Sequence, residues 1–106
     1  MNIIESSKYK KSYKKILKNK TNEQERLNKI ISLIKSSINL HMVIINPLSK
    51  MYHIEQKKGN LKEYYTARIN QKIRLFMKPI GKFPYDTVEI TDIEFVEIND
   101  KHYGEG

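Results

Sequence analysis

The chain has 106 residues, enough for one domain with a single modest hydrophobic core. Its hydrophobic fraction of 39% and mean hydropathy of −0.64 fit a soluble α+β domain and exclude full disorder. Cysteine is absent, which excludes disulfides and cysteine-based zinc sites and favours the cytoplasm. No segment is long and apolar enough to span a bilayer, and no apolar signal-like core follows Met1, so we expect no membrane partner.

The net charge of +8 is distributed unevenly along the chain. Residues 1–22 hold seven lysines and one acid, residues 23–84 hold twelve cations and four acids, and residues 85–106 hold seven acids and one lysine. A basic body favours a polyanionic partner, either nucleic acid or an acidic protein. The lysine run between Lys8 and Lys18 is interpreted mainly as a solvated helix face, with contact to an RNA backbone as the alternative.

The N-terminal residues predict a strand followed by a helix. Residues 1–5 suit a first strand, and Ser6 or Ser7 can cap a helix that starts near Lys8. The apolar side chains then recur at helical spacing until the helix ends near residues 19–20. They are Tyr9, Tyr13, Ile16 and Leu17.

A second helix is predicted directly afterwards. Thr21 with Gln24, or Asn22 with Glu25, has the spacing of a capping box, and an apolar stripe continues to about Ile38. Because only a few residues separate the two helices, we expect an antiparallel αα-hairpin.

The second half of the chain reads as strands and loops. The segment 40–45 fits a buried strand or an irregular apolar segment, and Asn46 before Pro47 ends it. A turn is predicted at 57–60 and a loop at 79–84. The predicted strands are 51–55, 61–69, 72–78 and 87–98. In the last of these the apolar residues change parity twice, which predicts bulges or a break into two short strands.

The stretch 65–76 combines cations with β-branched and aromatic residues. Under strand alternation Ile69, Ile73 and Leu75 face a core, while Arg68, Lys72 and Arg74 share the opposite face. The dipeptide at 70–71 is a plausible turn, so this stretch is either one strand or a hairpin. In both cases the cations collect on one surface.

The order of elements is β-α-α-β-β-β(-β). It predicts an α+β fold in which an N-terminal strand and an αα-hairpin pack on a mainly antiparallel, twisted sheet of four or five strands. We expect residues 1–106 to form a single domain with a short acidic tail from about residue 99.

The string YYTARINQKIRLFM, residues 64–77, resembles the arginine-bearing hairpin of bacterial toxins in the RelE/ParE superfamily. The order of elements resembles that superfamily over essentially the whole chain, and Pro47-Leu48, the turn at Gly59 and His102-Tyr103 fit the same pattern. Within it the chain is most similar to the HigB-like branch, with the Txe/YoeB branch next. Two departures from Txe/YoeB are Asn46, where that branch has a glutamate proposed as a general base, and Lys72-Ile73, where it has Glu-His.

The resemblance implies the toxin of a type II toxin–antitoxin pair that acts as an mRNA interferase. Such an enzyme cleaves mRNA on the ribosome by attack of a 2′-hydroxyl on the adjacent phosphate, without a metal or other cofactor. The implied partners are an antitoxin protein, mRNA and ribosomal RNA.

Arg74 is the first candidate to stabilise the phosphate, and Arg68 is the second. His102 is the candidate acid or base, and Tyr103 can stack on a base or shuttle a proton. Positive charge for binding RNA would come from Lys57, Lys58, Lys62, Lys72 and Lys78. His41 and His53 have no partner motif and are interpreted as structural.

Two other functions are compatible with the same fold. One is a ParE-like inhibitor of DNA gyrase that binds without catalysis. The other is a non-toxic module that binds nucleic acid or protein. The cations of residues 65–76 would then be surface charges, with Arg68 pairing to Glu63 or Glu89.

Overall fold

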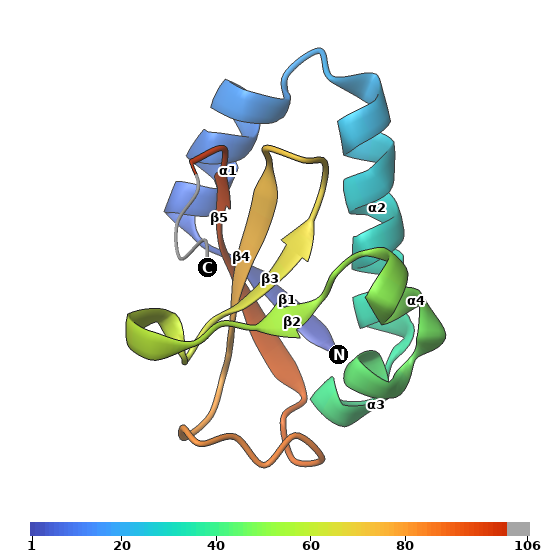
Figure 1. Ribbon diagram of the computed structural model, residues 1–106, viewed down its shortest axis with the longest axis vertical. Coiled ribbons are helices and arrows are strands. Elements are labelled where there is room, and N and C mark those ends of the chain that lie inside the picture. The colour runs from blue at the N-terminus through green and yellow to red at the C-terminus, as the bar shows by residue number, and fades with distance from the viewer. Residues whose placement is uncertain (102–106) are drawn as a thin grey trace.

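A five-stranded sheet with the order β1-β5-β4-β3-β2 forms the centre of the molecule (Figure 1). The computed structural model describes residues 1–101. Strands β1 and β5 pair in parallel, and the other neighbours pair antiparallel. The strands are β1 (Asn2–Glu5), β2 (Glu55–Gln56), β3 (Tyr65–Arg68), β4 (Arg74–Pro79) and β5 (Asp92–Asn99). The predicted α+β fold with its mainly antiparallel sheet is confirmed.

The helices pack against one face of the sheet and complete the hydrophobic core. They are α1 (Ser7–Ser12), the π-helix η1 (Tyr13–Leu17), α2 (Thr21–Ser36), α3 (Leu40–Ile45) and α4 (Pro47–Met51). Figure 1 shows α1 and α2 running antiparallel, as the predicted hairpin requires. Within residues 1–101, no helix has the length and apolarity needed to cross a membrane.

The core lies between these helices and one face of the sheet. Leu17, Leu27 and Ile30 from the helices pack against Leu75 and Phe95 from the strands, and all five are almost completely buried. The apolar stripe of the predicted first helix therefore faces the sheet, as its spacing indicated.

Helices α1 and α2 start differently. Ser6 caps α1 as predicted, because its hydroxyl accepts from the amide of Tyr9 at 2.9 Å. The capping box predicted for α2 is wrong: the residue before α2 is Lys20, which makes no side-chain cap. Gln24 donates instead to the carbonyl of Leu17 at 2.7 Å, closing the turn between the helices. Helix α2 also ends at Ser36, short of Ile38.

Residues 40–51 form two short helices, so both interpretations of 40–45, as a buried strand and as an irregular apolar segment, are wrong. Each helix is capped by an asparagine: Asn39 accepts from the amide of Met42, and Asn46 accepts from the amide of Leu48, both at 2.9 Å. Pro47 occupies the first turn of α4, where its missing N–H costs nothing. Asn46 and Pro47 thus end one helix and start the next.

Strand β2 is much shorter than predicted. The segment 51–55 was expected to be a strand, but Met51 ends α4 and a turn follows before Glu55–Gln56. The predicted turn at 57–60 leads into a 3₁₀ helix, η2 (Gly59–Leu61), so strand β3 begins only at Tyr65 instead of Leu61.

Strands β3 and β4 form a hairpin, which decides between the two interpretations of residues 65–76. Arg68 and Arg74 are partners across the ladder, and Ile69, Ile73 and Leu75 are buried in the core. The side-chain oxygen of Asn70 closes the turn by accepting from the amides of Lys72 and Ile73 at 2.8 and 2.7 Å.

Strand β5 contains a bulge. Phe76 pairs with Glu97, and its neighbour Met77 pairs with Phe95, so Val96 is the additional residue. This accounts for the second parity change predicted over 87–98. The first change lies before Asp92, in the loop that joins β4 to β5.

Helix α1 protects the edge of β5 that β1 leaves uncovered. The pairing of β1 stops at Phe95. Beyond it, the Ser6 hydroxyl donates to the carbonyl of Val96 at 2.7 Å, and the Ser12 hydroxyl accepts from the amide of Ile98 at 2.9 Å. Two serine side chains therefore replace the missing strand partner.

We expect Ser12→Ala to destabilise the protein by about 1–3 kcal/mol, because the part-buried amide of Ile98 loses its acceptor. Ser36→Ala is the matched control. Both hydroxyls donate to the carbonyl three residues earlier in their own helix, but only that of Ser12 also accepts from a strand. Urea denaturation measures the free energy of unfolding of each variant. Equal losses for the two variants would contradict the role of Ser12 at the edge of β5.

Candidate active site on the open sheet face

The sheet face opposite the helices carries polar, charged and aromatic side chains. We call it the open face and define it by the residues whose parity is opposite to that of the core positions Ala67, Leu75 and Ile98. These are Thr66 and Arg68 on β3, Arg74, Phe76 and Lys78 on β4, and Glu97 and Asn99 on β5. The predicted gathering of Arg68 and Arg74 on one surface is therefore present.

Arg68 lies beside a histidine that the sequence did not connect to it. The guanidinium Nη1 of Arg68 is 3.4 Å from Nε2 of the exposed His53. Because a guanidinium can only donate, this contact requires Nε2 to accept, with the imidazole proton on Nδ1. His53 was interpreted as structural, and its position beside Arg68 makes it a candidate functional residue instead.

The backbone of His53 is in the left-handed region, with φ of +50°. A residue with a β-carbon adopts this conformation at a cost of order 1 kcal/mol. The turn that requires it closes α4, where the His53 amide donates to the carbonyl of Lys50 at 3.2 Å. The turn therefore holds His53 in a strained backbone conformation, and this conformation places its imidazole next to Arg68.

Arg26 on α2 holds the two segments that carry His53 and Arg68. Its Nε donates to the carbonyl of Arg68 at 2.9 Å, and its Nη2 donates to the carbonyl of Met51 at 2.8 Å. Its guanidinium also lies 5.0 Å from the ring centroid of the buried Tyr52. The amide of Arg68 donates to the carbonyl of Tyr52 at 2.7 Å. Arg26 is therefore a positioning residue.

One donor of the Arg68 guanidinium, Nε, is buried and makes no hydrogen bond within residues 1–101. A buried donor of a charged group without an acceptor is costly and is rare in folded proteins. Arg68 also faces Arg74 directly across the ladder, an arrangement of like charges that destabilises a sheet. An anion bound at the arginine pair would offset the repulsion between the two positive charges.

Arg74 is oriented toward the hairpin turn. Its Nη1 donates to the carbonyls of Asn70, Gln71 and Ile73 at 2.6, 3.1 and 3.3 Å. The same arginine therefore fixes the turn and contributes positive charge next to Arg68.

Asn70 ties this turn to α2. Its amide nitrogen donates to Oε2 of Glu23 at 3.1 Å. This hydrogen bond, assisted by a backbone hydrogen bond and by the charge of Lys20, lowers the pKa of the Glu23 carboxyl from its usual value of 4.5. The tether is strongest when Glu23 is ionised.

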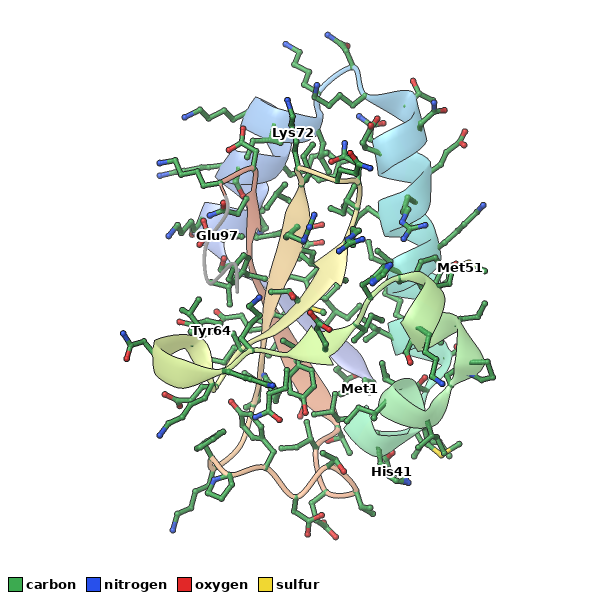
Figure 2. The ribbon with its side chains drawn as sticks, in the orientation of Figure 1. Met1, His41, Met51, Tyr64, Lys72 and Glu97 are labelled. Atoms are coloured by element: carbon green, nitrogen blue, oxygen red, sulfur yellow. The ribbon has the colours of Figure 1, made fainter. Side chains whose placement is uncertain are left out.

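The five lysines predicted to bind RNA do not form one cluster. Lys72 is at the tip of the hairpin, whereas Tyr64, which marks the start of β3, lies at the other end (Figure 2). Lys57 donates its amide to the carbonyl of Tyr64, and Lys78 lies 5.9 Å from the Tyr64 ring centroid. Lys58 precedes η2, and Lys62 follows it. Only Lys72 is therefore near the arginine pair.

Two aromatic residues on this side of the sheet were also missed by the sequence analysis. Tyr64 and Phe76 contact edge to face, with ring centroids 6.3 Å apart. Their parity with the arginines was the available signal. Phe76 is buried and Tyr64 is partly exposed, so only Tyr64 has a ring face available for base stacking. The predicted catalytic residues His102 and Tyr103 lie outside the described residues.

Asn46, at the position where the Txe/YoeB branch has a glutamate, is used by the fold. Its side-chain oxygen accepts from the amide of Leu48 as the cap of α4. This amide side chain is not basic enough to serve as a general base.

We expect Glu23→Gln to lower the free energy of unfolding at neutral pH and to have little effect in acid. A folded-state pKa below the unfolded value of 4.5 adds stability that is present above that value and is lost as the pH falls through the folded pKa. Thermal unfolding at neutral pH and at about pH 3 measures the stability of the variant relative to the parent. Glu25→Gln, at an exposed position of the same helix, is the control, and a pH-independent loss for Glu23→Gln would contradict the tether.

Replacing Arg26 tests its positioning role. We expect Arg26→Met to cost about 1–3 kcal/mol, because the carbonyls of Arg68 and Met51 lose a shared donor. Arg26→Lys keeps the charge but cannot bridge two carbonyls with a planar group, so it should recover only part of the loss. Urea denaturation gives both values, and full recovery by lysine would show that charge alone matters.

No family model matches the chain, and no curated protein sequence matches it. Solved structures do match. The YoeB/ParE toxin from Agrobacterium tumefaciens has a TM-score of 0.66 at 17% identity, over 96% of this chain and 100% of that one. YafQ from E. coli has a TM-score of 0.66 at 16% identity, over 99% of this chain and 98% of that one.

A third structure is the heterotetrameric YoeB–YefM toxin–antitoxin complex from Staphylococcus aureus. Its matching chain has a TM-score of 0.61 at 23% identity, over 97% of this chain and 98% of that one. The structural neighbours are thus YoeB-, YafQ- and ParE-type toxins of the RelE/ParE superfamily, and the predicted HigB-like branch is not confirmed. The chain has the fold of these toxins.

Proposed function

We propose that the protein is the toxin of a type II toxin–antitoxin pair and acts as a ribosome-dependent mRNA endonuclease. The observation that carries this proposal is the Arg68–His53 pair on the open face, where a phosphate-binding cation and a proton-transfer group are 3.4 Å apart. The fold shared with YoeB and YafQ supports the toxin class.

The reaction needs three contributions from the protein. A base takes the proton of the 2′-hydroxyl, so that this oxygen forms a bond to the adjacent phosphorus. A cation stabilises the extra charge on the pentavalent phosphate. The bond from phosphorus to the 5′-oxygen then breaks, and an acid returns a proton to that oxygen. The products are a 2′,3′-cyclic phosphate and a 5′-hydroxyl.

Arg68 is assigned to the phosphate. Its guanidinium offers paired donors that match two phosphate oxygens. Arg74 adds positive charge from the partner strand while its Nη1 maintains the turn.

His53 is assigned to proton transfer. In the free protein its Nε2 accepts from Arg68. When a phosphate, a stronger acceptor than a neutral imidazole, takes the guanidinium N–H, the Nε2 lone pair is released and can accept the 2′-hydroxyl proton. Binding of the substrate would in this way prepare the base. His102 and Tyr103 remain the proposed source of the second proton and of base stacking.

The remaining assignments concern binding. Lys72 is proposed to extend the positive surface next to the arginine pair, and Lys57, Lys58, Lys62 and Lys78 to contact RNA at the opposite end of the hairpin. The proposed partner that neutralises the toxin is an antitoxin, as the S. aureus complex of YoeB with YefM illustrates for its own toxin.

We expect Arg68→Ala and His53→Gly each to abolish growth inhibition when the chain is expressed in bacteria. Loss of a transition-state cation or of a general base typically reduces the rate about 10²–10⁴-fold. Glycine is chosen at His53 because it removes the imidazole and tolerates the positive φ, so the variant should fold at least as stably as the parent. Primer extension on mRNA from translating ribosomes locates the cuts.

The control is His41→Ala, which removes the histidine of α3 and should leave cleavage intact. Retained cleavage in folded His53→Gly would overturn the role of His53, and retained cleavage in folded Arg68→Ala would overturn the site. Accumulation of gyrase–DNA cleavage complexes with intact mRNA would instead identify a gyrase inhibitor.

A further inference from the structure

The two short helices α3 and α4 expose apolar side chains on their outer side. Met42 and Ile45 of α3 are 43% and 55% exposed, and Leu48 and Met51 of α4 are 42% and 58% exposed. Ile38, directly before α3, is 76% exposed. We call these five residues the α3–α4 patch. Figure 2 shows Met51 at the outer edge of α4, remote from the hairpin tip at Lys72.

This arrangement is unusual for helices on a protein surface. Leu40 and Val43 of α3 are already buried against the core. A surface helix normally has one apolar stripe and a polar opposite face, whereas α3 is apolar on both sides apart from His41. Contiguous exposed apolar surface of this kind marks an interaction site.

A hollow of about 500 Å³ continues the patch toward α2. Leu48 and Tyr52 form its wall on the α4 side, and Lys29, Ser32 and Leu33 form its wall on α2. Leu48 belongs both to the hollow and to the patch. An elongated partner could therefore place one apolar side chain in the hollow and others along α3 and α4.

The charge of the segment that carries the patch and the hollow favours an acidic partner, although the β4–β5 loop, whose Thr87 carbonyl accepts from the amide of His41, also brings Asp86 and Glu89 near α3. Residues 26–54 contain no Asp or Glu, and they include Arg26, Lys29, Lys35 and Lys50. A second copy of this chain would bring like charges together, which disfavours self-association. A partner with acidic residues beside its apolar ones would gain from burial of apolar surface in the patch and from attraction to these cations.

We propose that the α3–α4 patch and its hollow bind an acidic amphipathic helix, supplied by the protein partner that regulates this chain. The proposal rests on the proposed function in taking that partner to be the antitoxin. An amphipathic helix presents apolar anchors at positions i, i+3, i+4 and i+7, which suits the groove between α2 and α4. The bound helix would cover the outer side of the segment that leads directly into Tyr52 and His53.

The probe is a synthetic acidic peptide of about 18 residues, five helical turns, with leucines at helical spacing and glutamates between them. A second peptide has the same leucines with lysines in place of the glutamates. Fluorescence anisotropy with the intact protein should show binding of the acidic peptide at micromolar concentration and at least about 10-fold weaker binding of the basic one.

Substitutions locate the binding. The double variant Ile45→Glu/Met51→Glu should weaken binding of the acidic peptide at least about 10-fold. Ile4→Glu/Ile80→Glu is the matched control, because these residues are 49% and 46% exposed but lie on β1 and in the β4–β5 loop, and it should bind like the parent. Circular dichroism confirms that both variants are folded.

Three results would overturn the proposal. They are no binding of the acidic peptide, an equal affinity in all variants because the peptide binds the lysines of α1, and a dimer in sedimentation that only Ile45→Glu/Met51→Glu dissociates. Growth inhibition is measured separately. If the patch behaves as proposed but the parent protein neither inhibits growth nor cleaves mRNA, the proposed function fails while the docking surface stands.

Discussion

The candidate site depends on one arginine that is not part of it. Arg26 reaches from α2 to the carbonyls of Arg68 and Met51 and lies against the ring of Tyr52. Three elements meet there: the long helix, the end of α4 and the end of β3. None of these contacts is local, since 25 and 42 residues separate Arg26 from its two acceptors. A planar guanidinium can satisfy two carbonyls and pack on a ring at once, which explains why an arginine occupies this position.

The open face is less stable than it could be, and its costs are concentrated around Arg68. Its Nε is buried without an acceptor among residues 1–101, its ladder partner is another arginine, and the histidine beside it has a left-handed backbone. Each of these features is unfavourable in the folded protein. Natural proteins tolerate such conflicts mainly where function requires them. The well-packed core on the opposite face, with Leu75 and Phe95 fully buried, supplies the stability that makes the conflicts tolerable.

Two faces of the same short segment serve different proposed purposes. Residues 47–53 carry Leu48 and Met51 on the outer side of α4 and then deliver His53 to the open face through a tight turn. The segment is anchored by Arg26 at Met51 and by the Asn46 cap at its start. A partner bound to α4 would therefore contact the element that positions the imidazole, without reaching the arginine pair itself.

The sequence by itself determined the elements whose signals are local. The stripe from Tyr9 to Leu17, the Ser6 cap and the alternation around Ile69–Leu75 depend on periodicity and on neighbouring residues, so the helical hairpin and the buried face of the β3–β4 hairpin were predictable. Short segments were not predictable in this way. Residues 40–45 are too few for periodicity to separate a helix from a strand, and the asparagine caps decided in favour of helices. Only the tertiary structure decided that His53 meets Arg68. They are 15 residues apart and no motif links them, so a turn, a strand pairing and the Arg26 contacts together bring them within 3.4 Å.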